Sequence, residues 1–151
     1  MFGWEKSAFG VIVKAAVQEA RERGDRRMGT EHLLLGLLHH EPVARALGAD
    51  VTRARAALGD LDREALRMLG VDVGEDLPAR PRKHPPLGGG SLTSNARAVI
   101  DRVAKGTTMR TRSEAPRIMA LALLDRERPD PVAQLIDRLG IDRAAARARL
   151  T

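Results

Sequence analysis

The chain has 151 residues, 43% hydrophobic and 30% charged, which suits one globular domain and excludes a chain disordered throughout. It has no cysteine, which excludes a disulfide framework, and three aromatic residues, so its core must be aliphatic. No apolar run reaches the ~18 residues of a membrane span, and no signal peptide is recognisable, so we expect a cytoplasmic protein.

The formal net charge is +6, and the excess lies in residues 78–117, which hold 9 basic and 2 acidic residues. A basic segment of this kind is compatible with nucleic-acid binding. The residues that would carry such binding are Arg80, Arg82, Lys83, Arg97, Arg102, Arg110 and Arg112. No aromatic side chains that could stack on bases lie among them, so nucleic-acid binding is the less favoured alternative.

Four helices are expected in the first part of the chain. Apolar residues recur at spacings of three and four over residues 5–23, and a second run over residues 33–38 is apolar on nearly every side, which predicts a buried helix. The expected start and stop residues are Gly24 as a stop, Thr30 as a cap, Pro42 as a start, Gly48 as a stop and Asp50 as a cap. A further short helical segment is expected over residues 62–69, before a Pro- and Gly-rich linker over residues 77–91.

The pattern starts again after this linker. Thr93 or Ser94 caps a helix, and three more are expected over residues 116–124, 131–139 and 142–150. Leu47-Gly48-Ala49-Asp50 matches Leu139-Gly140-Ile141-Asp142 at an offset of 92 residues. No stretch alternates with the period of two typical of a strand. We therefore expect an all-α fold of two pseudo-symmetric four-helix repeats, residues 1–58 and 92–151, joined by a connector over residues 59–91.

One motif identifies a family resemblance. The run Gly29-Thr30-Glu31-His32-Leu33-Leu34-Leu35-Gly36-Leu37-Leu38 resembles the N-terminal domain of the Clp/Hsp100 chaperones, especially the ClpC type. That domain is a pseudo-twofold pair of four-helix repeats, which agrees with the duplication. The second repeat is degenerate, because it has Ala115-Pro116-Arg117-Ile118 at the Gly-Thr-Glu-His position and Ala122 in place of Gly36.

The resemblance implies recognition of other proteins. The N-terminal domain of this family captures substrates and adaptors and passes them to an ATPase ring. No phosphate-binding loop of an ATPase occurs in the chain, so we expect no enzyme and no cofactor. The expected partners are a Clp ATPase or its clients and adaptors, with phosphoarginine or cyclic peptides as candidate ligands. Two interpretations stay open: a stand-alone adaptor or decoy, and an excised N-terminal domain.

In ClpC-type domains the acidic residue of each motif, with a Thr near the start of the first helix, is associated with phosphoarginine binding. The first repeat keeps Glu31 but has Lys6 where the Thr belongs, and the second keeps Thr93 but has Arg117 where the acid belongs. A carboxylate is needed for the guanidinium group and donors are needed for the phosphate. The sequence thus allows one site, in the first repeat, where Lys6 could donate to the phosphate, whereas Arg117 would repel the guanidinium group in the second repeat.

The predicted contact residues are Phe2, Trp4, Lys6, Thr30, Glu31 and Thr93. Phe2 and Trp4 serve either as anchors for a partner or as a hydrophobic staple on the first helix. Glu31 serves either a ligand or the positive end of its own helix. His32 is expected to pack or hydrogen-bond where the repeats join. No metal site is expected at His39, His40 and Glu41, because neighbouring helical histidines diverge.

Overall fold

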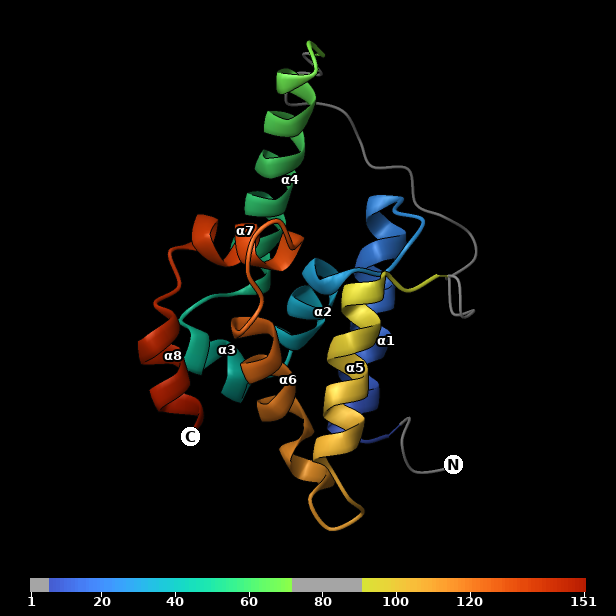
Figure 1. Ribbon diagram of the computed structural model, residues 1–151, viewed down its shortest axis with the longest axis vertical. Helices are drawn as coiled ribbons and strands as arrows, with labels where there is room; N and C mark the ends of the chain where they lie inside the picture. Colours follow the sequence, from blue (N-terminus) through green and yellow to red (C-terminus); the bar gives the residue numbers. More distant parts are fainter. Residues whose placement is uncertain (1–5, 72–90) are drawn as a thin grey trace.

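The computed structural model describes residues 6–71 and 91–151, and the regular elements there are all helices (Figure 1). They are α1 (Ala8–Arg23), α2 (Thr30–Leu37), α3 (Glu41–Leu47), α4 (Val51–Met68), α5 (Ser94–Gly106), the 3-10 helix η1 (Arg112–Glu114), α6 (Ala115–Leu124), α7 (Pro131–Leu139) and α8 (Arg143–Leu150). The expected all-α fold is confirmed. Phe2, Trp4 and most of the expected linker lie outside the described residues.

Most of the expected helix boundaries are observed. Gly24 ends α1 in the left-handed conformation, with φ 75°. The side chains of Asp50 and Thr93 cap α4 and α5. Thr30 is an exception, because Gly29 is the residue that caps α2 and Thr30 is already its first helical residue. The Thr30 hydroxyl therefore does not cap α2, and it donates to Asp130 across the repeat junction.

Helix contacts occur in matched sets, as a pseudo-twofold axis requires. α1 packs on α2 as α5 packs on α6, α4 packs on α7 as α8 packs on α3, and α1 meets α6 as α5 meets α2. The duplicated ends also match in detail. Gly48 and Gly140 both end their helices with φ 69°, and the next helices are capped by Asp50 and Asp142.

Arg55 and Arg147 stand at matching positions of the two repeats. Each connects the last helix of its repeat to the first two helices of that repeat. Arg55 donates to both carboxylate oxygens of Glu19, a residue of α1 that is 3% exposed, at 2.8 and 2.6 Å. Arg147 donates to Asp125, just after α6, at 2.8 Å. Burial tends to raise the pKa of Glu19, but the hydrogen bonds from Arg55 and His39 outweigh it, so the pKa is lowered.

The connector differs from the expectation in one respect. A break was expected after residue 58, but α4 continues without interruption to Met68, with Gly59 in its interior. The extension is held on α7 by Arg138, which donates to Glu64 at 2.5 Å, and on α1 by an ion pair between Arg23 and Asp62. The separate helical segment expected over residues 62–69 is thus the end of α4, which projects beyond the other helices (Figure 1).

Helices α2 and α1 approach each other closely at Gly36. A Cβ atom at this position would lie 2.5 Å from the carbonyl oxygen of Ile12 and 2.8 Å from the amide nitrogen of Ala16. Both atoms belong to the backbone of α1, so neither can move without moving the helix. Glycine at this position therefore sets the distance at which α2 packs on α1.

We predict that Gly36→Ala destabilises the protein by about 1–3 kcal/mol, because the added methyl group overpacks this contact. Gly59→Ala is the matched control, since its Cβ would meet only the flexible end of Arg63 at 3.7 Å. In the interior of α4 this control should leave stability unchanged or raise it by about 0.5–1 kcal/mol. Urea unfolding measures both variants, and equal stability of the two would contradict the packing argument.

Candidate peptide-binding site at the starts of α2 and α5

The loops that precede α2 and α5 are joined by backbone hydrogen bonds. The amide of Met28 donates to the carbonyl oxygen of Ser91 at 2.8 Å, and the amide of Thr93 donates to the carbonyl oxygen of Met28 at 3.1 Å. Thr93 therefore lies beside Met28, which directly precedes Gly29, Thr30 and Glu31 in the chain. The starts of the two helices form one composite surface, although they come from different repeats.

His32 fixes the conformation of the motif that follows. It is 1% exposed, its Nδ1 accepts from the backbone amide of Gly29 at 2.8 Å, and its Nε2 lies 2.7 Å from Oδ2 of Asp25. Because Nδ1 is an acceptor in this arrangement, Nε2 is the nitrogen that donates to Asp25. The predicted packing role of His32 matches this geometry.

The carboxyl group of Glu31 folds back over Gly29. A Cβ atom at Gly29 would lie 1.9 Å from Oε1 of Glu31, so glycine leaves the space that the carboxyl group occupies. The Glu31 side chain is 19% exposed, and its Oε1 is the buried side-chain polar atom of the described residues that has no hydrogen-bond partner. The nearest ring nitrogen, Nδ1 of His32 at 3.6 Å, already accepts from Gly29 and offers no proton.

Burial raises the pKa of Glu31, and the neighbouring Asp25 acts in the same direction. His32, a backbone hydrogen bond at Glu31 and Arg23 lower the pKa but do not outweigh the burial. Asp25 itself shows the opposite balance, since hydrogen bonds from His32 and Arg23 overcome its burial and lower its pKa. The site thus holds a satisfied carboxylate on Asp25 and, on Glu31, a carboxyl group whose Oε1 has no hydrogen-bond partner among the described residues.

Thr93 contributes donors on the other side of this surface. Its Oγ1 accepts from the amide of Ala96 at 3.1 Å, which leaves the hydroxyl proton free to donate outward. The first amides of α5 also have no partner within the helix, as at every helix N-terminus. A carboxyl group from α2 and donors from α5 therefore lie on the same composite surface.

Lys6 is not part of this surface. It precedes α1, whereas Glu31 follows α1, and a helix of 16 residues spans about 24 Å. Gly36 of α2 packs near Ile12, so the start of α2 lies toward the far end of α1. The expected pairing of Lys6 with Glu31 is therefore wrong. In the second repeat Arg117 stands where the acid belongs, and it is paired with Glu114 at 2.6 Å.

Thr30 belongs to the repeat junction. It is fully buried, and its hydroxyl donates to Asp130, which is 4% exposed and also accepts from Arg126 at 2.8 Å. This contact joins α2 to the loop before α7. Thr30 is thus placed to hold the motif on the second repeat, with no face open to a ligand.

Other candidate residues do not gather into a site. Of the residues considered for nucleic-acid binding, Arg102 is paired with Asp125 at 2.9 Å, and the first three lie outside the described residues. Within residues 6–71 and 91–151 no three His, Asp or Glu side chains are grouped as metal ligands. Over the same residues, no helix has the length and apolar character needed to cross a membrane.

Reasoning from the sequence missed that the loops before α2 and α5 adjoin, and it missed the reason for Gly29. The duplication carried the needed information, because a pseudo-twofold axis brings the start of one repeat's first helix to the start of the other repeat's second helix. Gly29 was read as part of a motif, although its role is to make room for a carboxyl group.

We predict that Glu31→Gln raises stability at neutral pH. A carboxyl group whose pKa is raised by folding is favoured in its protonated form, so the protein loses stability as pH rises from the unfolded pKa through the raised folded pKa. The stability gain of Glu31→Gln should be absent at pH 3, grow across that window and then stay constant.

The matched control is Glu127→Gln, the same change of charge at an exposed position. Thermal unfolding at a series of pH values measures both differences. A Glu31→Gln variant that is less stable than the parent protein at pH 7 would mean that Glu31 chiefly supports the start of α2.

Comparison with known proteins agrees with this architecture. The family model of the Clp repeat (R) N-terminal domain matches residues 7–105, about two thirds of the chain. A search of curated proteins found no match. Domains of this family bind substrates and are not catalytic, and they interact with the clients and adaptors of Clp ATPases. With its paired helical repeats and its Gly-Thr-Glu-His motif, the chain belongs to the Clp repeat N-terminal domain family.

Proposed function

We propose that the chain is a peptide receptor of a Clp chaperone–protease system, and that it binds arginine-bearing segments at the starts of α2 and α5. The observation that carries this proposal is the buried Oε1 of Glu31, which has no hydrogen-bond partner among the described residues. A buried carboxylate without a partner is costly, and a ligand that supplies donors removes that cost.

A guanidinium group is the donor that best fits this carboxyl group. It presents parallel N–H groups that match the two oxygens of a carboxylate, and it stays charged when it leaves water. Glu31 lies at the edge of the surface, with 19% of its side chain exposed, so an arginine side chain can approach it from solvent. Binding would shift Glu31 to its ionised form, since a positive charge lowers the pKa of a carboxyl group.

Phosphoarginine adds a second point of contact. Its phosphate would accept from the hydroxyl of Thr93 and from the first amides of α5, where the helix N-terminus favours negative charge. Lys6, which lies away from this surface, has no part in the proposed phosphate contact. One such site is proposed, because the second repeat carries Arg117 where the acid belongs, and Arg117 repels a guanidinium group.

In this role the protein presents bound clients or adaptors to a Clp ATPase or, when not attached to one, competes with it as a decoy. Phe2 and Trp4 remain the predicted anchors for larger partners, including cyclic peptides.

Calorimetric titration with three peptides tests the proposal. The peptides share one sequence and carry phosphoarginine, arginine or citrulline at the central position. We expect phosphoarginine to bind more tightly than arginine, and citrulline to show no binding. Glu31→Gln should weaken both binding peptides at least tenfold, since a lost charged hydrogen bond is worth about 1.5–3 kcal/mol.

The Thr93→Asp variant tests the phosphate contact separately from the guanidinium contact. Aspartate keeps the helix cap, so the fold is preserved, but its charge repels a phosphate. This variant should lose the preference for phosphoarginine and keep its affinity for the arginine peptide. Glu127→Gln is the control that leaves both affinities unchanged. Equal affinities for arginine and citrulline, or full binding by Glu31→Gln, would contradict the proposal.

A further inference from the structure

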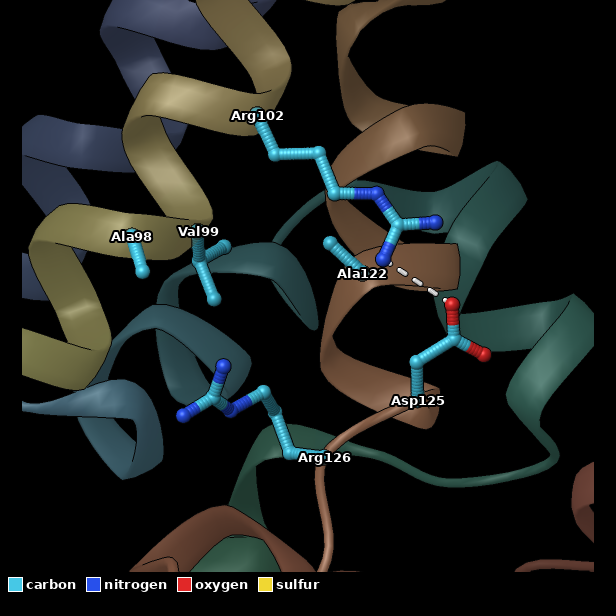
Figure 2. A pocket seen from close by; sticks show the side chains of 6 residues that line it. All are labelled: Ala98, Val99, Arg102, Ala122, Asp125 and Arg126. Carbon is cyan, nitrogen blue, oxygen red and sulfur yellow. Dashed lines mark ion pairs between the residues drawn. The ribbon is translucent and has the colours of Figure 1, made fainter.

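A cavity lies between α5 and α6, apart from the composite surface at the starts of α2 and α5. Its volume is about 160 Å³, room for about five water molecules at ~30 Å³ each. It is lined by Ala98, Val99, Arg102, Ala122, Asp125 and Arg126. Figure 2 shows the guanidinium group of Arg126 below Ala98 and Val99, while Arg102 reaches past Ala122 to Asp125.

Two arginine side chains line the cavity, and they have N–H groups that could bind a ligand. Arg126 uses its Nε to bind Asp130 at 2.8 Å, and among the described residues no partner is seen for its two terminal nitrogens. Arg102 uses Nη1 to bind Asp125 at 2.9 Å. Asp125 is shared with Arg147, so the carboxylate at the rim is already neutralised by two guanidinium groups. The local charge therefore favours an anion.

The C-terminal end of α6 would by itself disfavour an anion, because its last carbonyl groups carry partial negative charge. Here those carbonyl groups are occupied. The carbonyl oxygen of Leu124 accepts from Arg143 and Arg147, both at 3.1 Å, and the carbonyl oxygen of Arg126 accepts from Arg143 at 2.8 Å. α8 thus supplies the charges that neutralise the end of α6, and Arg126 lines the cavity beside it.

The remaining wall is apolar and small. Ala98, Val99 and Ala122 present only methyl groups, which cannot hydrogen-bond to a ligand. A phosphate has oxygens on every side and would leave some of them against this wall. A carboxylate has two oxygens on one side and carries an alkyl group on the other, so it matches the arrangement in Figure 2, where the guanidinium group of Arg126 lies below Ala98 and Val99.

We propose that this cavity binds a small aliphatic carboxylate, with its oxygens on Arg126 and its alkyl group on the side of Ala98 and Val99. Two sources share this chemistry: a free branched-chain acid, and the C-terminal residue of a peptide. The site is independent of the proposed arginine site, since it selects the opposite charge and shares none of its residues.

The test leaves the arginines unchanged. Arg126 neutralises Asp130, which also binds Thr30 at the repeat junction, so its replacement would disturb the fold. Ala98 is exposed on α5 and lines the cavity, so Ala98→Leu fills the cavity without a change of charge. Ala104→Leu, also exposed on α5 but not lining the cavity, is the matched control.

Methyl NMR spectra of the full chain would be recorded with acetyl-Gly-Gly-Val, its C-terminal amide, isobutyrate and inorganic phosphate as probes. We expect the free-acid peptide or isobutyrate to shift the methyl signals of Val99 and Ala122, and the one that does so identifies the source of the carboxylate. Affinity should fall at least tenfold in Ala98→Leu and stay unchanged in Ala104→Leu and Glu31→Gln.

Three results would overturn the proposal. The first is the absence of shifts at Val99 and Ala122 with both carboxylates at millimolar concentrations. The second is equal binding of the amide or of phosphate, which would remove the selectivity for an aliphatic carboxylate. The third is unchanged affinity in Ala98→Leu. None of them bears on the arginine site, which is tested by other ligands and other residues.

Discussion

The fold depends on the burial of α2, a helix that is apolar on almost every side. Its residues from His32 to Leu37 are all buried, and a single repeat cannot cover them. α2 contacts α1 and α4 of its own repeat and α5, α6 and α7 of the other. Among the described residues the buried hydrophobic core is aliphatic, with Phe9 packed partly buried against it, and helices approach closely at positions such as Gly36. The duplication is thus required for stability, because each repeat completes the core of the other.

The same junction creates the candidate site. The contacts that bury α2 also bring its first turn beside the first turn of α5, where Met28 bonds to the backbone on both sides of Leu92. Thr30 bonds to Asp130 across this junction, and His32 bonds to Gly29 and Asp25 within the first repeat. Glu31, between them, has an Oε1 atom with no hydrogen-bond partner among the described residues.

Much of this could be predicted from the sequence. Helix periodicity, the caps at Asp50 and Thr93 and the stops at Gly24 and Gly48 gave the order of the helices, because these are local effects. The continuous α4 was missed because its extension is held by Arg23 and Arg138, which are distant in sequence. The pairing of Glu31 with Lys6 was wrong for a related reason: a motif specifies residues within one repeat, whereas the site is formed by the contact between repeats.

The central claim is that Glu31 is a buried carboxyl group that lacks a partner until an arginine side chain binds. Carboxyl-carbon NMR can follow its titration directly, in the free protein and with the arginine peptide. The account predicts a pKa above the ordinary value of about 4.3 in the free protein, and a fall in that pKa when the peptide is bound. An ordinary pKa in the free protein, unchanged by the peptide, would contradict it.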